Sequence, residues 1–299
     1  MSVRKRSEAH GTDSFVSYRG YFLPPNIEEA RLTNRELDKF ELTDEDLLVV
    51  GFPKSGATRM TLLLREMYDN WGLIEAAGRK VVAQLEWSVS QFHTEGAVGI
   101  AKKMFATDPT DMTTSRRLIK TRLPYPIVPE KLREGKICKV IYISRNPKDV
   151  CVNYYSFEKS SLPLGEDGEP IPWEAFVQNF AEGLVVYGPW LNHVTEWLKH
   201  RDDDNFLHVS YEDLMQKPDT VIRTLAEFIG YPLDEVAVKR LSRFRADGTD
   251  KDPDMKGVKK GVIGEWKKHF SEEQSKMFDR DIGMMLKAKN LDFLYTPYQ

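Results

Sequence analysis

Apolar residues along this chain concentrate in three short runs, and stretches with helical periodicity separate the runs. The runs at residues 47–52, 137–143 and 206–209 are mostly apolar, a pattern typical of strands that are buried on both faces of a sheet. After the first run, apolar positions recur every three or four residues from Met60 to Tyr68, which predicts a helix. Strands that alternate with helices indicate parallel βαβ units. We therefore predict an α/β fold with a central parallel sheet flanked by helices.

Turn and cap residues mark where some of these elements begin and end. Asn146 and Pro147 follow the second apolar run. Asparagine is favoured as a helix cap and proline as the first helical residue, so we predict a helix that runs to about residue 157. Residues 162–171 and 243–260 are rich in charge, Gly or Pro and lack a clear pattern, and we predict that both are loops.

Composition and charge exclude several classes of protein. Lys and Arg total 43 against 46 Asp and Glu, and this balance disfavours a nucleic-acid partner, which requires a basic excess. The chain has 2 cysteines, too few for a disulfide framework, and no apolar run approaches the roughly 18 residues of a membrane span. Residues 1–15 lack the apolar centre of a secretory signal. We expect a cytoplasmic protein with no membrane partner, built as an irregular N-terminal arm (1–40) and a single domain (41–299).

The best chemical signal is the segment GFPKSGATR at residues 51–59, between the first predicted strand and its helix. Backbone N–H groups at a helix N-terminus bind anions, and Gly56 permits a close approach of the backbone to a phosphate. Lys54 would add charge and Thr58 a hydroxyl donor. The spacing is similar to a P-loop, but Ala57 stands where the loop lysine belongs, which disfavours a nucleoside-triphosphate kinase or ATPase. On this segment alone, an ordinary strand-to-helix turn is the alternative.

Four further segments follow this loop in order. They are KTRLP at 120–124, YISRNPKD at 142–149 with Tyr154 and Tyr155, YED at 211–213, and KKG at 259–261 with GEWK at 264–267. Together with the loop, this set resembles the cytosolic sulfotransferases, which use 3′-phosphoadenosine 5′-phosphosulfate (PAPS). The resemblance spans about residues 40–285. It implies the P-loop-like sulfotransferase fold and transfer of a sulfuryl group to a hydroxyl or amine of a small aromatic acceptor. The product would be 3′-phosphoadenosine 5′-phosphate (PAP), and no metal is implied.

The same resemblance assigns residues to each part of the site. For the 5′-phosphosulfate, it implies Lys54, Ser55, Gly56, Ala57 and Thr58. For the 3′-phosphate, it implies Arg145, Asn153, Lys259, Lys260 and Gly261. For the adenosine, it implies Arg59, Tyr211, Ser242 and Phe244. For the acceptor wall, it implies Trp87 and Phe157. Lys54 and Lys120 would neutralise charge during the transfer.

The sharpest departure from the family pattern lies at Arg122, where the family has the histidine that takes the acceptor's proton. Arginine stays protonated and has no acceptor lone pair, so it cannot be the general base. Either the acceptor ionises easily, or another base replaces the histidine while Arg122 acts as an electrostatic clamp. Among the histidines, His93 is the candidate, because it follows the predicted wall at Leu85–Trp87.

Smaller departures affect the nucleotide site and the assembly. Arg59 replaces a tryptophan that stacks on adenine, Ala57 replaces a threonine, Asn153 replaces a serine and Lys259 replaces an arginine. Residues 267–276 lack the apolar centre and the acid of the family's C-terminal dimer segment, which predicts a monomer or a dimer formed in another way. The departures leave open a catalytically impaired protein that binds PAPS or PAP. A nucleotide kinase is a third reading, weakened by the missing loop lysine.

Overall fold

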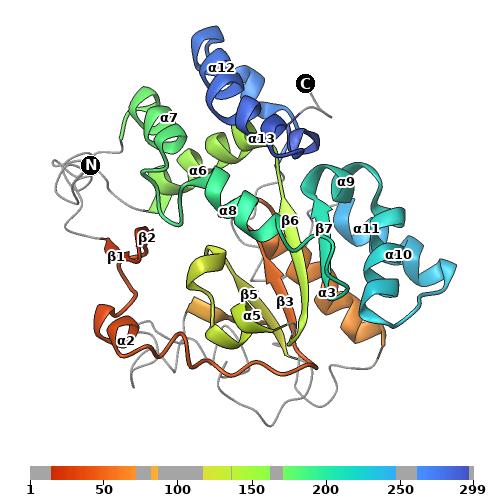
Figure 1. The fold of residues 1–299 in the computed structure, drawn as a ribbon. Coiled ribbons are helices and arrows are strands. Elements are labelled where there is room, and N and C mark those ends of the chain that lie inside the picture. Colours follow the sequence, from red (N-terminus) through yellow and green to blue (C-terminus); the bar gives the residue numbers. More distant parts are fainter. Residues whose placement is uncertain are drawn as a thin grey trace.

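Five parallel strands form the central sheet of the computed structural model (Figure 1). The structure describes residues 15–71, 82–86, 117–135, 137–161, 171–246 and 261–295. In the order in which they lie side by side, the strands are β4 (Val82–Gln84), β5 (Leu118–Thr121), β3 (Leu47–Val50), β6 (Lys139–Ser144) and β7 (Phe206–Ser210). Every neighbouring pair is parallel. The prediction of an α/β fold with a central parallel sheet is confirmed.

The sheet is buried on both faces, as the apolar runs predict. Leu48 and Val50 of β3 belong to one apolar cluster of the core, and Leu47 and Val49 belong to the other. This alternation follows from the two-residue period of a strand. Helices on either side complete both clusters. They are α3 (Ala57–Asn70), α6 (Pro147–Ser161), α7 (Trp173–Glu182), α8 (Trp190–Leu198), α9 (Tyr211–Gln216), α10 (Pro218–Ile229) and α11 (Glu235–Ala246).

Short elements surround this centre. They are α2 (Glu29–Thr33), η3 (Tyr125–Ile127), α5 (Glu130–Glu134), η5 (Glu265–Lys268), α12 (Glu272–Phe278), η6 (Asp279–Gly283), α13 (Met284–Ala288) and η7 (Asp292–Leu294). The segment predicted not to form the usual dimer, residues 267–276, runs from the end of η5 through most of α12, and the assembly stays a prediction.

Two predicted boundaries differ from the structure. Helix α6 begins at Pro147, as predicted, and the Asn146 side chain accepts a hydrogen bond from the Lys148 N–H at 3.0 Å. The helix continues to Ser161, beyond the predicted end near 157. Helix α11 continues to Ala246, so the predicted loop 243–260 is helical in its first residues, and 247–260 lie outside the described residues.

The N-terminal segment is not irregular over residues 15–40, contrary to expectation. It contains an antiparallel hairpin of β1 (Val16–Tyr18) and β2 (Tyr21–Leu23), followed by α2. Five of its apolar residues belong to the same buried cluster as Leu48 and Val50 of β3, namely Leu23, Ile27, Leu32, Leu37 and Phe40. These elements are too short to show a period in the sequence, and contacts with the rest of the chain stabilise them instead.

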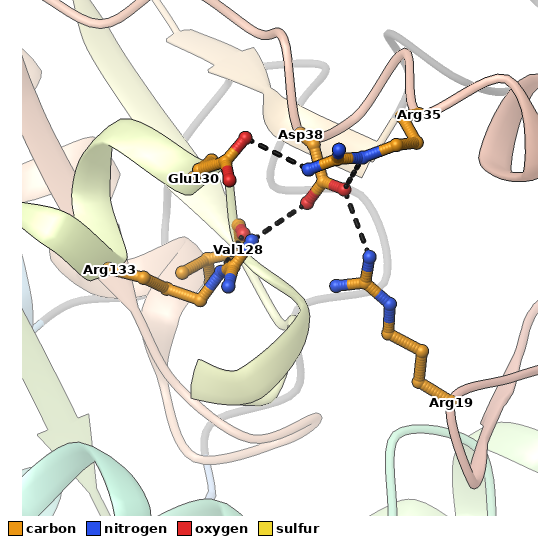
Figure 2. Close-up of polar contacts among 6 residues, drawn as sticks. All are labelled: Arg19, Arg35, Asp38, Val128, Glu130 and Arg133. Atoms are coloured by element: carbon orange, nitrogen blue, oxygen red, sulfur yellow. Dashed lines mark hydrogen bonds and ion pairs between the residues drawn. The ribbon is translucent and has the colours of Figure 1, made fainter.

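A cluster of charges connects this segment to the sheet region (Figure 2). The Asp38 carboxylate accepts hydrogen bonds from Arg19 and Arg35, each at 3.0 Å, and from Arg133 at 2.9 Å. Arg35 also donates to Glu130 at 2.9 Å. Since Glu130 and Arg133 belong to α5, these ion pairs join the hairpin and the end of α2 to an element nearly one hundred residues further along the chain.

Candidate active site

The candidate site lies at the carboxyl ends of three neighbouring strands. In the sheet, the last residue of β3 is level with Thr121 of β5 and Tyr142 of β6. The loop 51–59 and Arg122 therefore begin at the same edge, and β6 delivers Arg145 to it. Ligands of open parallel sheets bind at this edge. The topology thus brings together three of the sequence-predicted segments.

The loop 51–59 has the backbone of an anion-binding turn. Lys54 and Gly56 adopt left-handed conformations, with φ of 68° and 104°. A Cβ on Gly56 would lie 2.6 Å from the Tyr211 ring, so only glycine fits there without a shift. No side chain caps the N-terminus of α3, and the buried Ser55 hydroxyl has no hydrogen-bond partner among the described residues. The turn therefore offers donors to an anion, consistent with the predicted phosphosulfate site.

Lys54 lies where the loop approaches the acceptor segment. Its Nζ is 4.0 Å from the centre of the Phe157 ring, the distance of a cation–π contact. Burial, and secondly the positive charge of Arg122, lower the pKa of Lys54 to about 8. Three of the predicted site residues are thus neighbours. Phe157 is 44% exposed beside this cation.

Helix α8 and a buried glutamate hold the segment KTRLP. The Trp197 indole N–H donates to the Leu123 carbonyl at 3.0 Å, and His193 Nε2 lies 3.1 Å from the Arg122 carbonyl. Burial lowers the pKa of His193 to about 3, so this histidine is neutral and Nε2 carries the proton that reaches the carbonyl. The Arg122 backbone N–H donates to Glu86 Oε1 at 2.5 Å. His193 is therefore structural, as the sequence indicates.

The side chain of Arg122 faces the interior of the site. It hydrogen-bonds Tyr187, and its charge acts on Lys54. Lys120, two residues earlier in β5, is 6% exposed. A cationic group at 122 thus adds to an already positive region, which suits an anionic ligand and not a proton acceptor.

Arg145 and Gly261 form a second cluster at the same edge. The Arg145 guanidinium lies 4.4 Å from the centre of the Tyr211 ring and donates to the Val262 carbonyl at 3.1 Å. A Cβ on Gly261 would be 2.7 Å from Arg145 Nη1, and the Tyr211 hydroxyl donates to the Gly261 carbonyl at 2.9 Å. Arg145 is 3% exposed, and its Nε has no partner among the described residues. A buried guanidinium with a donor to spare suits a phosphate.

Asp149 organises the chain around this cluster. Its carboxylate accepts the backbone N–H of Gly264 at 2.8 Å and of Trp266 at 3.0 Å. The Asn153 side chain donates to the Asp149 carbonyl at 2.8 Å, within α6. The first turns of α6 therefore hold residues 261–266 against Arg145.

The remaining predicted residues lie in different parts of the structure. Ala57, Thr58 and Arg59 form the first turn of α3, where Arg59 is buried. The Ser242 hydroxyl bonds the Val238 carbonyl within α11 and the Asp219 carboxylate. Trp87, His93, Lys259 and Lys260 lie outside the described residues, and so does the side chain of Phe244.

The sequence interpretation missed several residues that organise the site. Glu86, Tyr187 and Asp149 each act through a contact described above. Glu158, 6% exposed in α6, hydrogen-bonds Tyr154, and burial raises its pKa to about 7. The sequence signal for these residues was the presence of Asp and Glu in or near the recognised motifs. A carboxylate that is buried there requires a hydrogen-bond or charge partner within the site.

Fold and site define a P-loop-like α/β protein whose anion-binding loop lacks the lysine of nucleoside-triphosphatases. The family model of the sulfotransferase domain matches residues 44–290, and the chain belongs to the sulfotransferase family. It is 31% identical to sulfotransferase 1B1 of Mus musculus over 291 residues, which span 90% of this chain and 92% of that protein. It is 27% identical to sulfotransferase 2A1 of Homo sapiens over 284 residues, 90% of this chain and 94% of that protein.

Solved structures share the fold at lower identity. Mouse sulfotransferase SULT7A1, complexed with PAP, matches with a TM-score of 0.74 and 22% identity over 95% of this chain and 99% of that chain. Retinol dehydratase in complex with androsterone and PAP matches with a TM-score of 0.73 and 22% identity, over 95% and 93% of the two chains. These matches confirm the sulfotransferase fold.

In the part of the chain that the structure describes, no helix combines the length and apolar character needed to cross a membrane. Among these same residues, no group of three or more His, Cys, Asp and Glu side chains is arranged to hold a metal ion.

Proposed function

We propose that this protein transfers a sulfuryl group from PAPS to a hydroxyl or amine of a small aromatic acceptor, without a metal. The observation that supports this most directly is the juxtaposition of two anion-binding clusters at one edge of the sheet. One is the turn at 51–59, and the other is Arg145 with Gly261. A nucleotide with phosphates at both its 5′ and 3′ positions requires two such clusters.

The residues present fit this nucleotide. The unpartnered Ser55 hydroxyl and Arg145 Nε are buried donors, and buried donors without partners are costly unless a ligand satisfies them. The 5′-phosphosulfate would contact Lys54 to Thr58. The 3′-phosphate would contact Arg145 and Gly261 with Asn153, Lys259 and Lys260. For the adenosine, the proposed contacts are Arg59, Tyr211, Ser242 and Phe244. Two matched structures contain PAP.

When bound, PAPS supplies a sulfuryl group activated by its bond to a phosphate oxygen. The protein's part is positioning and charge stabilisation. Lys54 would neutralise the charge that develops on the phosphate oxygen, and Lys120 would neutralise charge on the transferring group. Arg122 would orient the same anionic group, and Trp87 and Phe157 would hold an aromatic acceptor. The sequence also names His93 as a candidate base in place of the family histidine, and a loss of transfer in His93→Ala would support that role.

A second candidate function is binding of PAPS or PAP without efficient catalysis. Arg122 is the observation that favours it, because this side chain cannot accept a proton. Loss of a positioned base lowers a rate by about 10²–10⁴-fold.

One experiment distinguishes these functions from each other and from a nucleotide kinase. The purified protein is incubated with radiolabelled PAPS and a panel of phenols, alcohols and amines, and with ATP as the alternative donor. Thermal shifts with PAP are measured in parallel. We expect transfer from PAPS, stabilisation by PAP and no transfer from ATP. Stabilisation without turnover would support the binding protein and refute the enzyme.

Two further proposals concern the protein as a whole. We propose a cytoplasmic protein without nucleic-acid or membrane partners, checked by fractionation of cells that express it. We also propose a monomer, or a dimer that does not use residues 267–276. Light scattering of the wild type and of variants in this segment tests that proposal, and a dimer disrupted by those variants would contradict it.

A further inference from the structure

Glu86 is a buried carboxylate with a hydrogen-bond donor on one of its two oxygens. It lies two residues after the end of β4 and is 1% exposed. Its Oε1 accepts the Arg122 backbone N–H at 2.5 Å. Its Oε2 is buried and has no hydrogen-bond partner among the described residues. A buried oxygen without a donor is costly, so within the described residues Oε2 is placed to accept a hydrogen bond or a proton from a bound group.

The sheet places this carboxylate beside the segment where the acceptor is expected. Strand β4 pairs in parallel with β5, with Gln84 level with Lys120. Glu86 lies two residues beyond Gln84, in a 3₁₀ turn, and its side chain reaches the backbone of Arg122, two residues beyond Lys120. On the other side of β5, the loop 51–59 begins at the same level. Glu86 therefore lies at the carboxyl edge of the sheet, next to the residue that replaces the family histidine.

The charges around Glu86 suit a group that takes up and releases a proton. Burial raises its pKa, and the charge of Arg122, the Arg122 N–H and the charge of Lys120 oppose this effect. Tyr187 faces it from the segment before α8, and Lys54 faces Arg122 from the loop. A base becomes more effective as its pKa approaches the working pH, and burial shifts the pKa of Glu86 in that direction.

We propose that Glu86 is the general base of the transfer and accepts the acceptor's proton on Oε2. This inference rests on the proposed function. The acceptor O–H bond breaks and its proton passes to Glu86, while the acceptor oxygen forms a bond to sulfur. The bond from sulfur to the 5′-phosphate oxygen breaks, and its electron pair remains on that oxygen beside Lys54. The proton on Glu86 then returns to solvent.

The test compares Glu86→Gln with wild type on a series of phenols and alcohols of increasing pKa. A nitrophenol that is already ionised at the assay pH requires no base, whereas an aliphatic alcohol does. We expect E86Q to lower kcat by about 10²–10⁴-fold for the alcohol and by less than about tenfold for the nitrophenol. The wild-type profile of kcat/KM for the alcohol should rise with pH through one ionisation, and E86Q should lack this rise.

The matched control is Glu212→Gln. Glu212 is also a buried carboxylate that accepts a backbone N–H, from Asn146 at 2.9 Å, but it lies beside Arg145 at the other cluster. A substitution that only weakens structural support should lower kcat by the same factor for every acceptor. We therefore expect any loss of kcat in E212Q to be independent of the pKa of the acceptor. PAP thermal shifts show whether each variant retains a folded nucleotide site.

The outcomes separate the inference from the proposed function. An equal loss for all acceptors in E86Q would overturn the inference and leave the proposed function intact. The inference would also be overturned if the loss of kcat depended on acceptor pKa in His93→Ala or Glu158→Gln instead of in E86Q. If the wild type transfers to no acceptor, the proposed function fails and the inference fails with it. An E86Q variant that does not fold is replaced by Glu86→Asp, which should retain the dependence on pH at a lower rate, and E86D with a flat pH profile would overturn the inference.

Discussion

Replacement of Asp38 by asparagine measures how strongly the N-terminal segment is held to the rest of the protein. The carboxylate is 5% exposed and accepts hydrogen bonds from Arg19, Arg35 and Arg133 (Figure 2). Removal of one partner from a buried ion pair costs about 3–5 kcal/mol. These arginine side chains are 26% to 55% exposed, so water can solvate them after the substitution. We therefore expect Asp38→Asn to lower the free energy of unfolding by about 2–3 kcal/mol.

The pH dependence of the difference in unfolding free energy between wild type and D38N supplies a second test. Burial raises the pKa of Asp38, but the hydrogen bonds and charges of Arg35, Arg19 and Arg133 outweigh burial, and the net pKa is below its usual value. The stabilisation is therefore fully present above the unfolded pKa of about 3.9 and is lost as pH falls through the lower folded pKa. The wild type should approach the variant in stability as the solution becomes acidic.

The assay is urea denaturation followed by tryptophan fluorescence, between pH 7 and the lowest pH at which both proteins fold. The control is Asp281→Asn, which removes an exposed carboxylate paired with the exposed Arg280. We expect no measurable change in the control, because exposed ion pairs contribute little. Equal stability of D38N and wild type at pH 7 would refute the reasoning. A difference in unfolding free energy that does not decrease as the pH is lowered would refute it as well.

Four further predictions concern the site. Because the pKa of Lys54 in the free protein is about 8, its cation is lost as pH rises through this value, so kcat/KM for PAPS should fall above about pH 8 and Lys54→Arg should keep kcat/KM high at higher pH. Arg145→Ala should abolish the thermal shift with PAP, and an unchanged shift would exclude its phosphate contact. Asp149→Asn should weaken PAP binding about tenfold in calorimetry, because the Gly264 and Trp266 N–H groups lose an ionised acceptor. With Glu86 as the base, Arg122→His should give no gain in kcat for alcohols of high pKa, and a gain of at least about tenfold would mean that the proton passes position 122.

Local rules in the sequence were sufficient for the elements that carry the anion-binding turn. The apolar run at 47–52, the glycine at 56 and the period of α3 are properties of neighbouring residues, and they predict a strand, a turn and a helix without reference to the rest of the chain. The start of α6 at Asn146 and Pro147 is predictable for the same reason, since capping involves residues within one helical turn. The order of the five motifs then indicated the family.

The tertiary structure decided which distant residues meet. Asp149 and Gly264 are 115 residues apart, Arg145 and Val262 are 117 apart, and Glu86 and Arg122 are 36 apart. Such contacts follow from the order of strands in the sheet, which no local pattern specifies. The same reason explains the N-terminal segment, whose short strands and helix are stable only because the core and Asp38 hold them. Sequence patterns thus identified the groups that bind a phosphate, whereas burial and strand order decided which carboxylates lie beside them.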